Sequence, residues 1–320
     1  MHTRTVAATT AAALGAGVLL LSGPVVPARA DTGAPAGHLS GPPAPERGEP
    51  LVIAHRGASA HAPENTLAAV DHAARLGFRW VENDVQRTRD GELVVVHDET
   101  LARTTDVEER FPGRAPWRVR DFTAAEIAGL DAGSWFGPAW AGSRVPTLTA
   151  YLRRVDRNRQ SLLLEVKRPE LYPGIERDIL RELGARGWLD RAHVRHRLVV
   201  QSFGAQSLRA VREQHPGVVT GFLGTPPLTE LPVYAAFTDQ INPPHTAVTP
   251  EYVAAVQRLK GPHGKRLRVS TWTVNDAAGA RRVAAAGVDG IITDRPDVVR
   301  DALEEGGAGG PGHRAAPAGS

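Results

Sequence analysis

Short apolar runs rich in β-branched residues alternate with longer segments of helical periodicity through most of this chain. This order is typical of parallel strands that are connected by helices. Eight consecutive units in a chain of this length predict an α/β fold, a closed (β/α)8 TIM barrel. The strands are expected at residues 51–54, 80–85, 162–166, 198–201, 218–222, 240–242, 268–273 and 290–293. The helices are expected at residues 65–76, 148–155, 175–186, 205–214, 228–236, 250–259, 276–286 and 296–304.

An open, doubly wound sheet is the alternative arrangement of alternating units. Such sheets usually carry a glycine-rich phosphate loop after the first strand. The segment that follows residues 51–54, HRGASAHAPENT, lacks the G-x-G-x-x-G spacing. The barrel is therefore the preferred prediction.

The connection between the second and third expected strands, residues 86–147, differs from the others. It contains a hairpin about Asp90-Gly91 and then a loop rich in Pro, Gly and Trp, with no clear amphipathic helix. Long excursions of this kind often form a lid or a pocket wall. The aromatic residues of the loop could equally form a small core of their own; they are Trp117, Trp135, Phe136 and Trp140.

The two ends of the chain have the composition of processed or disordered segments. Arg4 precedes an apolar stretch over residues 11–21 and an A-x-A pattern ends at Ala30, as in a secretory signal peptide cleaved after that residue. A retained membrane helix is the alternative, although the apolar stretch is short for one. With no cysteine in the chain, a lipobox is excluded. We expect a signal peptide over 1–30, a disordered linker over 31–50, the domain over 51–304 and a disordered tail over 305–320.

Removal of residues 1–30 would take away two arginines and no acid, lowering the formal net charge from +3 to +1. No basic tract with interleaved aromatic residues is present, so nucleic acid is an unexpected partner. We expect a secreted protein with no stable membrane span after cleavage.

Charged side chains gather where the expected strands end. His55 and Arg56 follow the first strand, whereas Glu82 and Asp84 lie two apart on the second and so share one face. A tight turn at Asp90-Gly91 would place His97 opposite Asp84.

Glu165 and Lys167 share a face at the end of the third expected strand. Three carboxylates in one small space need a counter-charge, and all-oxygen ligands suit Mg²⁺ or Ca²⁺ better than zinc. A metal beside Arg56 and Lys167 forms an anion site suited to phosphate, and two histidines could act as general acid and base. The combination predicts metal-assisted cleavage of a phosphodiester.

From Leu51 to about Ala302 the chain resembles the glycerophosphodiester phosphodiesterase family. The matching segments are AHRGASAHAPENTLAA, VENDVQRTRDGELVVVHD, LARTTD, LDAGSW, LEVKRP, QSF, WTVN and GIITDRP, in the family's order and spacing. The resemblance implies that Glu82, Asp84 and Glu165 bind the metal. It also implies that His55 and His97 are the acid/base pair and that Arg56 and Lys167 contact the phosphate.

Four further positions are open to two interpretations or depart from the family. Asn65 either caps the first helix or takes part in the site, and Glu64 either complements that helix dipole or pairs with Arg56. Trp272 either lines the substrate pocket or belongs to the core. Asn83 stands where the family usually has an apolar residue, and a buried amide there would need a hydrogen-bond partner.

The resemblance implies hydrolysis of a small glycerophosphodiester to sn-glycerol 3-phosphate and an alcohol. A phospholipase D-type enzyme acting on lysolipids or sphingolipids, or a teichoic-acid hydrolase, is the alternative with the same chemistry. A non-catalytic glycerophosphodiester-binding protein is a further alternative, against which the complete set of site residues argues.

Overall fold

The computed structural model describes residues 48–307. The predicted signal peptide, most of the predicted linker and residues 308–320 of the predicted tail lie outside the described residues. Among residues 48–307, no helix has the length and apolarity needed to cross a membrane.

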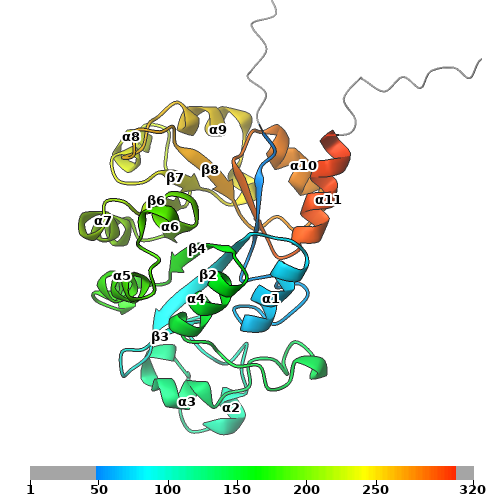
Figure 1. The fold of residues 1–320 in the computed structure, drawn as a ribbon, viewed down its shortest axis with the longest axis vertical. Helices are drawn as coiled ribbons and strands as arrows, with labels where there is room; N and C mark the ends of the chain where they lie inside the picture. The colour runs from blue at the N-terminus through cyan, green and yellow to red at the C-terminus, as the bar shows by residue number, and fades with distance from the viewer. Residues whose placement is uncertain (1–47, 308–320) are drawn as a thin grey trace, which may run out of the picture. The chain divides into compact units, whose positions relative to one another are not determined.

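Eight parallel strands close into a barrel (Figure 1). β1 pairs with both β2 and β9, so the sheet has no open edge at that point and the alternative of a doubly wound sheet is wrong. The barrel order is β1-β2-β4-β5-β6-β7-β8-β9, and β3 is an additional antiparallel strand on β2. The strands are β1 Leu51–Ala54, β2 Trp80–Arg87, β3 Leu93–Val95, β4 Ser161–Val166, β5 Leu198–Ser202, β6 Val219–Leu223, β7 Gln240–Asn242, β8 Arg268–Thr271 and β9 Gly290–Thr293.

Helices follow the barrel strands and cover the outside of the barrel. They are α1 Leu67–Arg75, α4 Leu148–Arg157, α5 Ile175–Ala185, α6 Arg191–His196, α7 Ala205–Gln214, α8 Leu231–Ala235, α9 Pro250–Gln257, α10 Ala277–Ala285 and α11 Pro296–Gly307. The excursion after β2 holds α2 Val107–Arg110 and α3 Ala124–Ala128. Every expected helix is present. The short helix α6 was not predicted, and α11 continues three residues beyond the expected end.

Most of the apolar core lies between the barrel and the helices. The apolar cluster inside the barrel is much smaller. Inside the barrel, one layer of four buried side chains comes from β1, β4, β5 and β9: Ile53, Leu163, Val199 and Ile292. Every second side chain of a strand points into the barrel. The inward positions that follow this layer toward the carboxyl ends of the strands are therefore available for charged side chains.

The hairpin β2–β3 has a different register from the expected one. Val85 faces Val95, and the Val96 amide donates to the Asp84 carbonyl at 2.9 Å, so Asp84 lies opposite Val96 rather than His97. The turn spans Thr88–Glu92, with the Thr88 amide donating to the Glu92 carbonyl at 2.9 Å. A loop with an odd number of residues shifts the pairing by one position relative to a two-residue turn, which explains the error.

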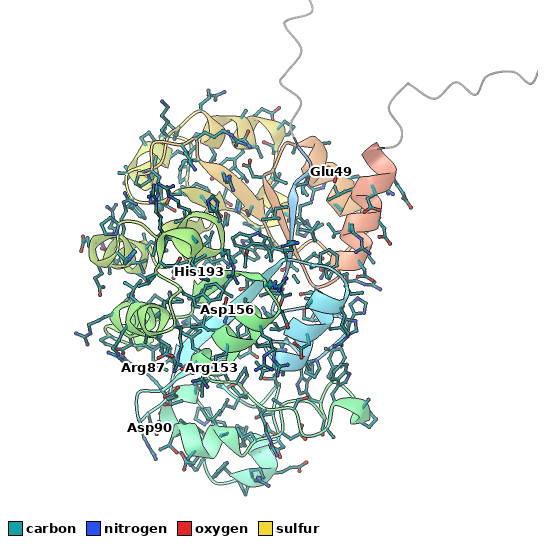
Figure 2. All side chains as sticks on the ribbon, viewed as in Figure 1. Glu49, Arg87, Asp90, Arg153, Asp156 and His193 are labelled. Carbon is teal, nitrogen blue, oxygen red and sulfur yellow. The ribbon has the colours of Figure 1, made fainter. Side chains whose placement is uncertain are left out.

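The excursion has its own small core, and one of its four highlighted aromatic residues packs against it. Trp117 packs beside buried residues that include Phe122, Ile127 and Leu130. The other three form a surface group in which Phe136 makes edge contacts with Trp135 and Trp140. Asp90, at the tip of the hairpin, accepts a hydrogen bond from the Ala124 amide and joins the hairpin to α3 (Figure 2).

Candidate active site

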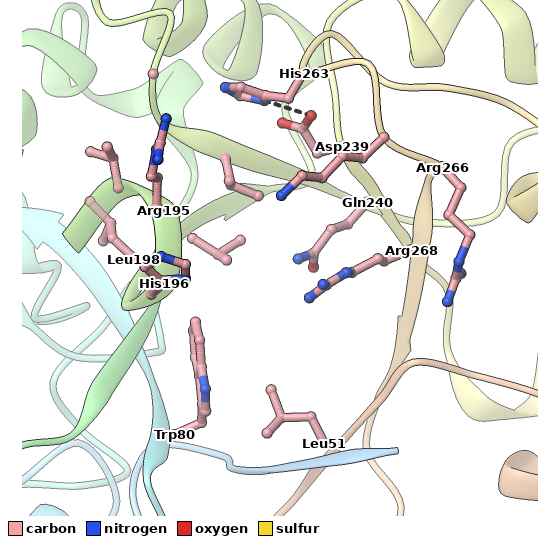
Figure 3. Close-up of a pocket in the computed structure, with 15 residues that line it drawn as sticks. Leu51, Trp80, Arg195, His196, Leu198, Asp239, Gln240, His263, Arg266 and Arg268 are labelled. Atoms are coloured by element: carbon pink, nitrogen blue, oxygen red, sulfur yellow. Dashed lines mark hydrogen bonds and ion pairs between the residues drawn. The ribbon is translucent and has the colours of Figure 1, made fainter. Parts of the chain in front are cut away.

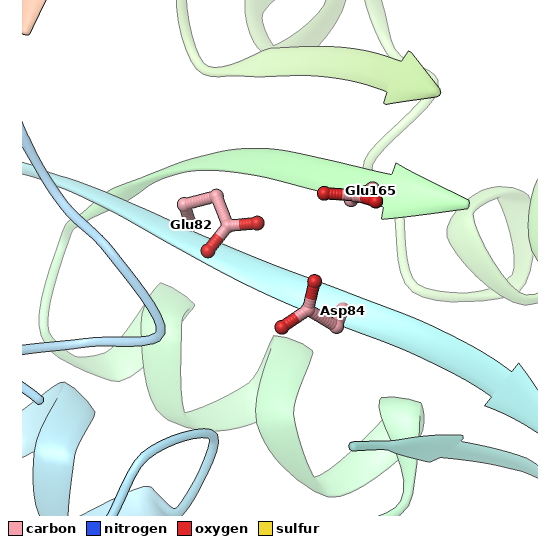
Figure 4. Close-up of side chains that lie close together, drawn as sticks. All are labelled: Glu82, Asp84 and Glu165. Atoms are coloured by element: carbon pink, nitrogen blue, oxygen red, sulfur yellow. The ribbon is translucent and has the colours of Figure 1, made fainter. Parts of the chain in front are cut away.

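Three buried carboxylates from β2 and β4 converge at the barrel mouth. Asp84 pairs in register with Glu165, and Glu82 lies on the same face of β2. One oxygen of each side chain lies within 4.8 Å of the others, and Figure 4 shows the three groups turned toward one another. The predicted carboxylate cluster is therefore confirmed.

Two cations neutralise part of this charge. Lys167 Nζ lies 2.8 Å from Glu165 Oε1 and 3.6 Å from Asp84 Oδ1. The backbone amide of Arg56 donates to Glu82 Oε2 at 2.9 Å, and its guanidinium Nε lies 3.3 Å from Asp84 Oδ2. Both cations therefore lie beside the carboxylates at the barrel mouth, and their contact with phosphate stays a prediction.

The pKa values of the three carboxylates diverge because both cations act on Asp84, and the negative charge of Asp84 in turn acts on Glu82 and Glu165. Burial and the negative charges of Asp84 and Glu165 raise the pKa of Glu82 well above its usual value. Burial and Asp84 also raise the pKa of Glu165 to about 7. Burial opposes ionisation of Asp84, but the charges of Lys167 and Arg56 outweigh it and lower the pKa of Asp84. The cluster thus lacks positive charge when it holds only protein groups.

The cluster fits a divalent oxygen-binding cation. Glu82 Oε1 and Asp84 Oδ1 are buried without a hydrogen-bond partner among residues 48–307. Two oxygens bound to one Ca²⁺ can be up to about 5 Å apart, since each lies about 2.3–2.6 Å from the ion. The separations in the cluster meet this requirement, so a cation would use the unpartnered oxygens and offset the excess negative charge.

His55 faces this cluster and is oriented by Asp294. Its Nδ1 lies 2.6 Å from Asp294 Oδ1, and its Nε2 lies 4.0 Å from Glu82 Oε2. Burial lowers the pKa of His55 more than its bond to Asp294 raises it, which favours neutral imidazole. With Nδ1–H donating to the carboxylate, Nε2 is free to accept or return a proton at the cluster.

His97 is held by an aspartate in the same way. Its Nδ1 lies 2.6 Å from Asp98 Oδ1, and its charge contributes to the low pKa of Asp84. Arg103 joins Asp98 to Glu64, since its Nε lies 2.5 Å from Asp98 and its terminal nitrogens contact both Glu64 oxygens. Although the predicted register was wrong, His97 lies two residues beyond the end of β3 and is joined to Glu64 at the site through Asp98 and Arg103.

Glu64 and Asn65 belong to the site rather than to the helix cap. Glu64 accepts from Arg56 at 2.8 Å. Asn65 is buried, and its Nδ2 donates to Asp84 Oδ2 at 2.7 Å. Thr66 is the residue that caps α1, because its side chain accepts from the Ala69 amide. The capping interpretation of Asn65 and the dipole interpretation of Glu64 are therefore wrong.

Trp272 lies at the mouth and does not contact the carboxylates directly. Its ring packs edge-on against Phe203 at 5.7 Å, and Phe203 lies 5.8 Å from Lys167 Nζ. Trp272 also packs partly against the barrel interior, as the core interpretation expects, and its role in lining a substrate pocket stays a prediction. A separate cavity of about 400 Å³ opens beside His55 and Arg56.

Asn83 is fully buried on the outer face of β2, between Val81 and Val85. Both polar atoms of its amide lack a hydrogen-bond partner within the described chain. The partner that a buried amide needs at this position is therefore absent among residues 48–307. Asn83 faces away from the carboxylates, so it affects packing and not the cluster.

The residues that orient the histidines were not predicted as site residues. Asp98 follows His97 in the sequence, and Arg103 lies in the LARTTD segment. Asp294 directly follows β9, the last barrel strand, and is separated from His55 by 239 positions. Its place after a strand at the same end of the barrel was a usable signal, but the pairing depends on side-chain geometry that the sequence does not show.

Comparison with known proteins agrees with this geometry. Residues 55–298 match the model of the glycerophosphoryl diester phosphodiesterase family. The chain belongs to this family. A glycerophosphodiester phosphodiesterase of Caldanaerobacter subterraneus subsp. tengcongensis is 37% identical over 261 residues, which cover 80% of this chain and 99% of the relative. One from Bacillus subtilis is 34% identical over 263 residues, covering 78% and 84%. The protein is thus a phosphoric diester hydrolase.

Solved structures of the glycerophosphodiester phosphodiesterase family share its fold. A glycerophosphodiester phosphodiesterase from Agrobacterium tumefaciens superposes with a TM-score of 0.63 at 29% identity, covering 79% of this chain and 99% of that one. An Oleispira antarctica phosphodiesterase, in complex with the product sn-glycerol-3-phosphate, superposes with a TM-score of 0.65 at 27% identity, covering 80% and 97%.

Proposed function

We propose that this phosphodiesterase hydrolyses glycerophosphodiesters to sn-glycerol 3-phosphate and an alcohol, with Mg²⁺ or Ca²⁺ held by Glu82, Asp84 and Glu165. The observation that carries the proposal is the buried carboxylate cluster beside two oriented histidines. The product-bound relative from Oleispira antarctica supports the choice of product. When bound, the ion would polarise the phosphorus centre through a phosphate oxygen.

Arg56 and Lys167 would bind the remaining phosphate charge. Arg56 Nε lies 3.3 Å from Asp84 Oδ2, and the Arg56 side chain also lines the cavity beside His55, where its guanidinium would bind a phosphate oxygen. The Arg56 guanidinium is fixed by its bond to Glu64. This rigidity reduces the entropy that would be lost when the substrate binds.

His55 and His97 would divide the proton transfers. Each directs Nδ1 to an aspartate, which leaves Nε2 for the substrate. One histidine takes the proton from the attacking oxygen, and the other gives a proton to the leaving alkoxide. This arrangement supports both direct attack by water and attack by the neighbouring glycerol hydroxyl.

An apolar rim favours lysolipids as a second candidate substrate class. Phe203 follows β5 and is 53% exposed, and Leu228 in the β6–α8 connection is 56% exposed. Both lie at the carboxyl ends of the strands, the end that carries the carboxylates. An acyl chain could be placed against such a rim.

The two substrate classes are distinguished by offering glycerophosphocholine and lysophosphatidylcholine to the same enzyme. We expect release of sn-glycerol 3-phosphate and choline from glycerophosphocholine at a higher kcat/KM. Leu228→Ser, which alters the exposed rim, serves as the matched variant and should impair only a lysolipid reaction. A preference for lysophosphatidylcholine that Leu228→Ser removes would favour the lipid substrate instead.

We also propose that the protein is secreted after cleavage behind Ala30. The apolar stretch and A-x-A pattern of the sequence support this. N-terminal sequencing of enzyme from the culture medium should begin at Asp31. Enzyme that stays with the cells and begins at Met1 would contradict the proposal.

A further inference from the structure

The amino ends of the barrel strands surround a cavity of about 630 Å³ at the end opposite the carboxylates. Its lining includes the first residues of several strands, among them Leu51, Trp80, Gln240 and Arg268 (Figure 3). TIM barrels usually fill this region with layered side chains. An open recess of this size falls in the range of small-molecule sites.

Strand alternation separates this recess from the catalytic cluster. On β2, Trp80 faces the recess, and Glu82 and Asp84 follow at successive inward positions. Trp80 and Asp84 are thus about 13 Å apart along the strand. The buried layer that includes Leu163 lies between the two ends.

The recess combines apolar walls with unpaired positive charge. Trp80, Leu51 and Leu198 provide apolar surface. Arg195, Lys265 and Arg268 are exposed and form no ion pair with any residue from 48 to 307. The remaining charged groups around the recess are already satisfied, since Asp239 contacts His263 and Arg266 contacts Asp289.

Gln240 adds a polar group that is directed at this space. Its residue is 7% exposed, and its side-chain amide forms no hydrogen bond with the described part of the chain. Figure 3 shows this amide and the Arg268 guanidinium extending toward the centre of the recess. The amide oxygen and nitrogen of Gln240 are absent from the fully buried, unpartnered side-chain atoms of the described chain, so they stay accessible and can hydrogen-bond a polar ligand atom in the recess.

We propose that this recess binds one molecule of an amphiphilic anion, a ligand with an anionic group on an apolar body. The anionic group contacts Arg195, Lys265 and Arg268, and the body packs against Trp80 and Leu51. The apolar side chains line a recess rather than a flat face, which suits a single molecule better than a membrane surface.

The test uses 1-anilinonaphthalene-8-sulfonate and its uncharged counterpart N-phenyl-1-naphthylamine as fluorescent probes, titrated into the protein without residues 1–30. The sulfonate should bind saturably at one site and more tightly than the uncharged probe. In the variant Lys265→Gln/Arg268→Gln its Kd should rise about tenfold, the effect of losing charged contacts. Exposed Arg153 and Arg157 on α4 lie outside the recess, so Arg153→Gln/Arg157→Gln controls for net charge and should change Kd less than about twofold.

Hydrolysis of glycerophosphocholine, measured with and without the sulfonate probe, shows whether the probe binds at the catalytic mouth. The sulfonate should leave KM unchanged, whereas competitive inhibition would place it at the catalytic mouth and overturn the proposal. Equal affinity for both probes, or an equal loss in the control variant, would also overturn it. Binding of phosphatidylglycerol vesicles without saturable probe binding would contradict a single-molecule ligand.

Discussion

Each histidine of the proposed acid/base pair is held through Nδ1 by an aspartate at 2.6 Å, His55 by Asp294 and His97 by Asp98. Because Nδ1 of each ring is bound to an aspartate, Nε2 is the nitrogen that remains for proton transfer. Asp294 also accepts from Asn275 and Ser59, which fixes its own position. At the scale of single residues, the histidines are therefore expected to carry the chemistry and the aspartates to position them.

Replacing either histidine should abolish most turnover. We expect kcat of His55→Ala and of His97→Ala to fall by about 10²- to 10⁴-fold, since each variant loses one proton transfer. Circular dichroism should show a wild-type fold. Near wild-type rates in one variant would remove that histidine from the acid/base pair.

Asp294→Asn tests whether Asp294 orients the His55 ring, separately from the proton transfer by His55 itself. Without the carboxylate, the imidazole loses its fixed tautomer, and kcat should fall about ten- to hundredfold with little change in KM. The pKa of His55 should fall further, because the contact with Asp294 is one that raises it. Comparing kcat and KM across pH would reveal both effects, and an unchanged kcat would show that Asp294 has only a structural role.

Asn83→Leu should stabilise the protein. The substitution removes a fully buried amide without a partner in the described chain and places an apolar group between Val81 and Val85. We expect the free energy of unfolding to rise by about 1–2 kcal/mol, with unchanged activity. A lower thermal midpoint would show that the amide is satisfied in solution or that leucine is too large for the site.

At the scale of elements, the excursion after β2 is a folded unit that reaches the site through Arg103. Its LDAGSW segment has a structural role. Asp131 accepts from the amides of Gly133, Ser134 and Gly142 at 2.6–2.8 Å. These bonds lower the pKa of Asp131 and fix the loop that carries Trp135.

Asp131→Ala should loosen this loop while leaving the barrel folded. Because the pKa of Asp131 is lowered on folding, its stabilisation is present at neutral pH and is lost as pH falls below about 4. The variant should lose about 1–2 kcal/mol of stability at pH 7 and show faster proteolysis between residues 131 and 145. Equal cleavage rates at pH 7 would contradict this role.

Elements that are determined by neighbouring residues could be predicted from the sequence, whereas features that depend on distant contacts could not. The strand Gly290–Thr293 was predicted to the residue because its apolar run is self-contained. Helix α6 was missed because, of its six residues, only Val194 is buried. Strand alternation was sufficient to place Glu82, Asp84 and Glu165 together. The hairpin register depended on loop length, and the pairing of His55 with Asp294 depended on closure of the whole barrel.

At the scale of the whole molecule, the barrel separates two chemically different ends. The carboxyl ends of the strands carry the acidic cluster with its cations and histidines, and the amino ends carry the basic recess. The thin interior layer of Ile53, Leu163, Val199 and Ile292 lies between them. The catalytic account depends on the first end alone.

The carboxylate cluster is proposed to bind a divalent cation that the reaction requires. The decisive measurement is release of sn-glycerol 3-phosphate from glycerophosphocholine by the protein without residues 1–30, after chelation and again with Ca²⁺ or Mg²⁺ restored. We expect activity to be lost on chelation and recovered with one ion, and Glu165→Gln to need a higher concentration of that ion. Full activity after chelation, or an unchanged metal requirement in Glu165→Gln, would contradict the account.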